Sequence, residues 1–134
     1  MKKLIGMAIL ATAATSVQAQ QVDVGTGDWS SLPRARVVGN ANVGPAVAAE
    51  VERIGRDRSC QVEGLGPRRV DIAVPFVLEI DSSQHVQRIV VKDIGCPELE
   101  TLLGQVVQRL AAIGEYSGTE GPGWYRSAIE LSID

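Results

Sequence analysis

Cys60 and Cys96 are the two cysteines of this 134-residue chain, and they could form a disulfide, bind a metal ion or act as reactive thiols. A metal site needs more ligands than two thiolates, and the chain supplies a single histidine, His85. The N-terminus described below has the pattern of an export signal, and an even cysteine count in an exported chain is most simply explained by disulfide formation. We therefore expect one structural disulfide, which closes a loop of about 36 residues and stabilises the fold by roughly 3–4 kcal/mol, less any strain.

His85, Glu79 and Asp81 are the residues that could take part in acid–base chemistry. No serine or cysteine motif lies near His85, so we interpret it as an exposed residue beside a turn. Glu79 and Asp81 are two positions apart in an extended segment and share one strand face, which is more typical of a polar outer face than of a catalytic pair.

The loop 117–123 is rich in glycine but lacks the lysine and the following helix that a phosphate-binding loop needs. The sequence also contains no H-E-x-x-H, G-x-S-x-G or Walker pattern. We therefore expect that the protein is not an enzyme and that it binds neither a cofactor nor a metal ion.

Three segments of the sequence are predicted to be extended strands. Residues 70–81 alternate between apolar and polar side chains, which predicts a strand with one buried face. Short polar residues at 81–84 predict a turn, and residues 85–92 resume an extended pattern rich in valine and isoleucine. A last alternating run, 125–133, predicts a third strand.

Two segments have helical spacing. Residues 97–113 begin with a proline and two glutamates in the first turn and carry one apolar face, formed by Leu99, Leu102, Leu103, Val106, Leu110 and Ile113. Residues 45–54 predict a shorter amphipathic helix, which Pro45 opens and Gly55 ends. The predicted disulfide would tie the end of the short helix to the start of the long one.

These elements predict an α+β fold of the order α-β-β-α-β, a three-stranded antiparallel sheet with both helices packed on one face. We expect the last strand to lie beside the first, so that the second and third strands are the edges. Pro75 interrupts the first strand and cannot donate a hydrogen bond. Either that end of the strand lacks a neighbour on one side, or it contains a bulge.

The N-terminal region divides into two parts. Residues 1–19 combine Lys2 and Lys3 with an apolar run and a Val-Gln-Ala cleavage site, the pattern of a secretory signal peptide. Its apolar run is shorter than the roughly 20 residues that span a bilayer, so we expect no membrane span after signal removal. Residues 20–44 form a leader that is either extended, laid against the domain through Trp29, or mobile. Residues 45–134 form the one folded domain.

The charge and composition of the chain limit the classes of molecule that it can bind. The formal net charge is −3, and aromatic residues make up 4% of the chain. A nucleic-acid binder needs a basic stripe or stacking aromatics, so we expect no nucleic-acid partner. The oligomeric state is not fixed by the sequence, and a dimer stays open.

The order of elements resembles the C-terminal domain of the TonB energy transducers. The resemblance covers about residues 45–133 and is carried by Val74–Asp81, His85–Lys92, Cys96–Glu100 and Trp124–Leu131. Val74–Asp81 and His85–Lys92 resemble the family's first two strands and their turn. Cys96–Glu100 resembles the entry into the second helix, and Trp124–Leu131 resembles the last strand. Gln84 stands where that turn usually has glycine.

The resemblance implies a standalone periplasmic, TonB-like protein of a Gram-negative bacterium. Such a module would capture an extended peptide, such as a segment of an outer-membrane receptor, by strand addition at its last strand. The predicted binding edge consists of Trp124, Tyr125, Arg126, Ser127, Ala128, Ile129 and Glu130. The alternative is a standalone periplasmic protein that uses the fold for cell-wall contact, enzyme inhibition or self-association.

Overall fold

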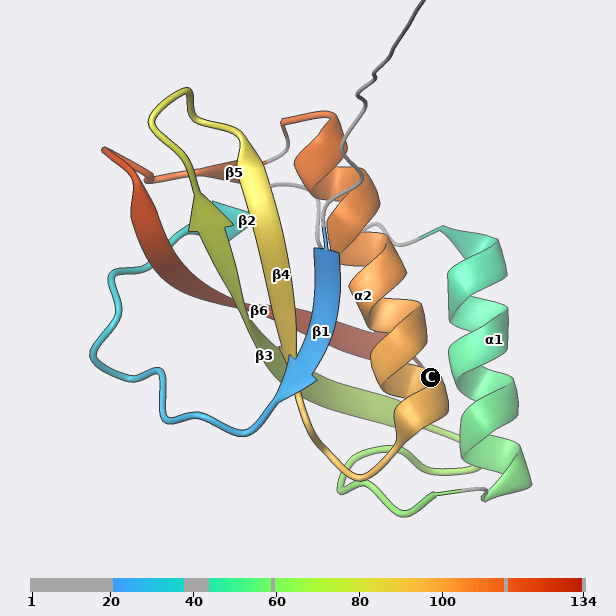
Figure 1. The fold of residues 1–134 in the computed structure, drawn as a ribbon. Helices are drawn as coiled ribbons and strands as arrows, with labels where there is room; N and C mark the ends of the chain where they lie inside the picture. The colour runs from blue at the N-terminus through green and yellow to red at the C-terminus, as the bar shows by residue number, and fades with distance from the viewer. Residues whose placement is uncertain (1–20, 38–43, 59, 115, 134) are drawn as a thin grey trace, which may run out of the picture.

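The computed structural model describes residues 21–37, 44–58, 60–114 and 116–133 (Figure 1). The predicted signal peptide, residues 1–19, lies outside the described residues. The elements in chain order are β1 (Gln21–Gly25), β2 (Arg36–Val37), α1 (Pro45–Asp57), β3 (Val70–Ile80), β4 (Val86–Lys92), α2 (Pro97–Ala112), β5 (Tyr116–Ser117) and β6 (Gly123–Ile133). No helix among these residues is long and apolar enough to cross a membrane.

The main sheet has four strands in the order β1-β4-β3-β6. As predicted, β6 lies beside β3, and β3 is antiparallel to both β4 and β6. The predicted three-stranded antiparallel sheet is wrong in one respect, because β1 pairs with β4 in parallel and makes the sheet mixed. The leader therefore supplies an edge strand, and β4 is an interior strand rather than an edge.

Strand β3 forms the centre of the core. Its side chains at even positions, from Val70 to Ile80, are all buried against the helices, which confirms the alternating pattern. Pro75 pairs with Ala128 of β6, while pairing with β4 begins only at Phe76. The missing donor of Pro75 points away from β6, and the β3–β4 pairs end at Phe76, so the proline lies just beyond the last of these pairs.

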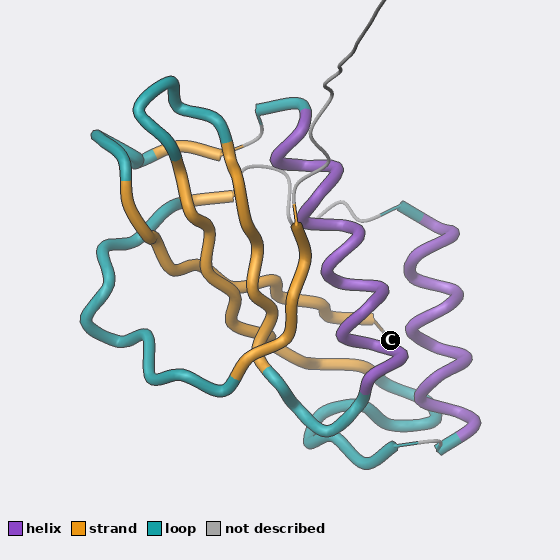
Figure 2. The backbone as a smooth tube through the Cα atoms, viewed as in Figure 1, coloured by secondary structure: helices purple, strands orange, loops and turns teal. Residues whose placement is uncertain are grey.

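Both helices cover the same face of the sheet (Figures 1 and 2). In α2, Leu99, Leu103, Val106 and Val107 are buried, whereas Leu102 and Leu110 are half-buried. Gly104 packs where β1 passes over the helix, since a Cβ atom there would come within 2.6 Å of Val22. The prediction that Ile113 belongs to the apolar face is wrong, because the helix ends at Ala112 and Ile113 is 71% exposed.

Helix α1 continues past the predicted stop at Gly55 and ends at Asp57. Gly55 is buried within the helix, and a Cβ atom at this position would lie 2.6 Å from the carbonyl oxygen of Gly66. The glycine therefore permits close approach of the loop that leads into β3, and Arg58 takes the left-handed conformation that terminates the helix (φ 52°).

The predicted disulfide is present between Cys60 and Cys96, whose Cα atoms are 5.4 Å apart. It links the loop after α1 to the residue that precedes α2. The buried carboxylate of Glu100 supports the same junction, because it accepts hydrogen bonds from the backbone N–H groups of Ile94 (2.7 Å) and Cys96 (3.2 Å). The disulfide thus fixes the end of α1 to the start of α2, and the charge-assisted hydrogen bonds of Glu100 hold the segment that leads into α2.

Candidate functional site

Strand β6 is an edge of the main sheet, and part of its outer edge already pairs with the leader. The backbone N–H of Arg126 donates to the carbonyl oxygen of Pro33 at 2.9 Å, and the N–H of Ala35 donates to the carbonyl oxygen of Arg126 at 2.8 Å. Arg34 and Arg126 form a parallel bridge. The leader thus lies along β6 for a few residues in the manner of an added strand.

This pairing fixes the direction of every backbone group in β6. Register with β3 continues without a shift from Gly123 to Ile133, so successive residues alternate in direction. The backbone groups of Trp124, Ala128, Glu130 and Ser132 point the same way as those of Arg126, away from β3. Those of the residues between them point toward β3.

Backbone direction divides the seven predicted edge residues. Trp124, Arg126, Ala128 and Glu130 direct their N–H and C=O groups outward. Tyr125, Ser127 and Ile129 direct theirs into the β3 ladder, so they are not positions at which a guest strand could bond.

Tyr125, one of the predicted edge residues, turns its side chain into the core. Its side chain is 8% exposed and belongs to the core. Its hydroxyl donates to the carbonyl oxygen of Gly121 at 2.8 Å and accepts from the N–H of Glu120 at 3.2 Å. The Ile129 side chain is buried as well. Trp124 lies on the outer face, with the guanidinium of Arg88 5.6 Å from its ring centroid.

The C-terminal half of β6 has an open outer edge. Among the described residues, no backbone group accepts from or donates to the outward N–H and C=O groups of Glu130 and Ser132. Both side chains are exposed. These groups continue the row that the leader occupies at Arg126, and they could pair with another extended segment.

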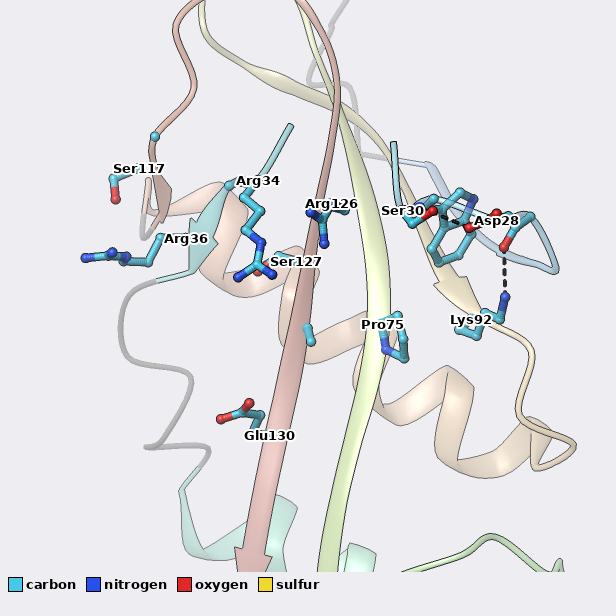
Figure 3. Close-up of a pocket in the computed structure, with 15 residues that line it drawn as sticks. Asp28, Ser30, Arg34, Arg36, Pro75, Lys92, Ser117, Arg126, Ser127 and Glu130 are labelled. Atoms are coloured by element: carbon cyan, nitrogen blue, oxygen red, sulfur yellow. Dashed lines mark hydrogen bonds between the residues drawn. The ribbon is translucent and has the colours of Figure 1, made fainter. Parts of the chain in front are cut away.

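A cleft of about 1100 Å³ lies beside this edge, on the face of the sheet opposite the helices. We call it the outer-face cleft (Figure 3). Strands β3, β4 and β6 supply Pro75, Lys92, Arg126, Ala128 and Glu130 to its lining. Most of the remaining lining residues come from the leader, and they include Asp28, Trp29, Arg34, Ala35 and Arg36.

Three contacts hold the leader over this face. The ammonium group of Lys92 donates to the carbonyl oxygen of Gly27 at 2.8 Å and lies 5.2 Å from the ring centroid of Trp29. Arg126 donates from Nε to the carbonyl oxygen of Leu32 at 2.7 Å. Residues 27–32 of the leader thus lie against the outer face, with Trp29 among the contacts.

The cleft is locally positive in a chain whose formal net charge is −3. Its lining contains the cations Arg34, Arg36, Lys92 and Arg126 but only two carboxylates, Asp28 and Glu130. None of the three arginines forms an ion pair with a carboxylate of the described residues. Hydrogen bonds from Ser30, backbone first, and the nearby charge of Lys92 lower the pKa of Asp28, so this carboxylate is charged at neutral pH.

The residues considered for acid–base chemistry do not come together in a site. His85 is exposed next to the β3–β4 turn, as predicted. The Asp81 carboxylate is a structural acceptor, because it binds the backbone N–H groups of Ser83 and His85 (both 2.9 Å) and the side chain of Gln87 (2.8 Å). No group of three or more His, Cys, Asp or Glu side chains in the described part of the chain could hold a metal ion.

The position of Arg34 and Arg36 in the cleft was not predicted from the sequence. One signal could have indicated it, namely the two-residue spacing of the arginines around Ala35, which is buried at 5% exposure. That spacing is typical of a short extended segment with one face on the protein.

Comparisons with protein-family models, with curated proteins and with solved structures gave no match for this chain.

Proposed function

We propose that the protein is a binding module that captures an extended peptide by strand addition along the outer edge of β6. The observation that carries this proposal is the pairing of Pro33 and Ala35 with Arg126, in which an extended segment already bonds to this edge. A guest would continue the same row at Glu130 and Ser132. The two exposed residues offer it two donors and two acceptors.

Strand addition suits an edge of this kind because backbone hydrogen bonds provide affinity for any extended sequence, whereas alternate side chains provide selectivity. Here the guest would have the outer-face cleft on one side, and the helices would not obstruct it because they cover the opposite face (Figure 1). The rigid β3–β6 ladder beneath the edge would reduce the entropic cost of binding.

We further propose that the domain is TonB-C-terminal-like and acts in the periplasm of a Gram-negative bacterium, with an outer-membrane receptor segment as its partner. Three features support this: the signal-like residues 1–19, the element order from α1 to β6, and the Cys60–Cys96 disulfide, which suits an oxidising compartment. The leader strand β1 and the Pro33–Ala35 pairing are additions to the element order on which the resemblance rests.

The proposal can be tested with a phage-displayed library of random peptides of about eight residues, the length of an ordinary strand. Peptides selected on the disulfide-bonded protein would then be titrated against Ser132→Pro and Ser132→Ala. Proline removes the outward N–H, whereas alanine keeps it, so only the proline variant should bind about threefold to tenfold more weakly. Equal affinity for both folded variants, or a library that yields no binder, would refute strand addition at β6.

A further inference from the structure

We propose that the outer-face cleft binds a carboxylate of the captured peptide between Arg34 and Arg126, so that the preferred guest is an acidic peptide. This inference rests on the proposed function and specifies the partner chemistry for the same edge. It is carried by the position of the two arginines, by the absence of a compensating carboxylate near them, and by the direction of guest side chains.

The fold places the two arginines next to each other. Arg34 and Arg126 form a parallel bridge, so their backbones are adjacent, and both side chains line the cleft. Figure 3 shows them together toward one end of the cleft, with Glu130 apart from them along β6. Glu130 is four positions after Arg126 along the strand, a distance of roughly 13 Å.

Arg34 and Arg126 bring two positive charges to the same part of the cleft, and like charges on neighbouring strand positions are unfavourable without an anion nearby. In the described part of the chain, no carboxylate lies within 4.0 Å of either group. Arg126 donates from Nε to Leu32, while its two terminal amino groups have no acceptor among the described residues. Arg34 is exposed and its side chain likewise has none there. The pair therefore presents unused guanidinium donors, the kind of donor that binds carboxylates.

A guest strand at β6 would direct alternate side chains over the outer face, the face on which Arg126 and Glu130 also lie. The cleft floor between them is formed by small or apolar side chains, Pro75 and Ala128, which leave room for a guest side chain. An aspartate or glutamate at such a position would reach the arginines. A lysine or arginine would meet like charge.

The test uses a selected acidic peptide and a copy in which every Asp and Glu is replaced by Asn or Gln. Each is titrated against the intact protein, against Arg34→Gln and against the control Arg56→Gln, which removes the same charge from the exposed end of α1. Compared with the intact protein, Arg34→Gln should bind the acidic peptide about tenfold more weakly, whereas Arg56→Gln should bind it with nearly unchanged affinity. The amide copy should bind the intact protein about tenfold more weakly and should not distinguish the variants.

Removing the negative charge at the other end of the cleft should act in the opposite direction, so Glu130→Gln should bind the acidic peptide more tightly. Selected peptides without acidic residues, or an equal effect of Arg34→Gln and Arg56→Gln, would overturn the inference while strand addition stands. If the library yields no peptide at all, the proposed function fails and the inference fails with it.

Discussion

The backbone N–H of Arg126 donates to the carbonyl oxygen of Pro33 across 2.9 Å, and this bond joins the last strand of the domain to its N-terminal leader. The leader also forms β1 at the opposite edge of the sheet, so one segment touches both edges. Edge strands need such protection because their unpaired backbone groups invite association. The leader pairs with β6 at Arg126, and the outward groups of Glu130 and Ser132 have no backbone partner among the described residues.

Stability should depend on the inner face of α2. Leu103 is fully buried between the helix and the sheet. Replacing it by alanine should lower the free energy of unfolding by about 2–5 kcal/mol, because methylene contacts are lost and a cavity remains. Gln105 is exposed on the same helix, and its alanine variant should change the value by about 0.5 kcal/mol or less. Denaturant unfolding measures both, and equal effects would contradict this placement of the helix.

The disulfide should contribute a large part of the stability. A Cys60→Ser, Cys96→Ser double variant should unfold with a free energy about 2–4 kcal/mol lower, since the unfolded chain is no longer constrained. Titration of denatured, unreduced protein should detect no free thiol. Two free thiols, or unchanged stability in the double variant, would show that this link is not formed or has no effect.

Glu100 should be more sensitive to substitution than other polar residues of α2. Its buried carboxylate accepts from the N–H groups of Ile94 and Cys96, so Glu100→Ala would leave one buried and one half-buried donor without this acceptor. We expect a loss of about 1–3 kcal/mol in unfolding free energy. Thr101→Ala at the exposed neighbouring position is the control, and a similar loss in both variants would argue against this role.

The β3–β4 turn should make the protein sensitive to acid. Hydrogen bonds from the backbone of His85 and then of Ser83 lower the pKa of Asp81 in the folded state. Because the folded-state pKa is depressed, this stabilisation is fully present above the ordinary aspartate value of about 3.9 and is lost as the pH falls through the lowered pKa. The stability difference between the wild type and Asp81→Asn should therefore shrink on acidification from about pH 7 to pH 2. A constant difference would exclude Asp81 as the titrating group.

Much of the core could be predicted because it follows local periodicity. The alternation from Val70 to Ile80 and the spacing of Leu99, Leu103 and Val106 directly specify the buried faces, and the structure buries them. Helix ends were less predictable. Glycine at position 55 predicts the end of the helix, but in the structure it allows close packing against Gly66. Local sequence patterns do not encode this tertiary contact.

The leader illustrates what periodicity cannot provide. Strand β1 is five residues long, and its half-buried Val22 packs against Gly104 on α2, a residue more than eighty positions away. Parallel pairing with β4 depends on that remote surface rather than on the leader's own pattern. The same holds for Arg34 and Arg126, whose proximity arises only when the leader returns to β6.

Amide hydrogen exchange of β6, measured residue by residue with and without a selected peptide, tests strand addition most directly. The N–H groups of Glu130 and Ser132 should exchange rapidly in the free protein and become protected when the peptide binds. Those of Ile129 and Leu131 already bond to β3 and should be protected in both states. Saturating peptide that leaves Glu130 and Ser132 unprotected would contradict the account.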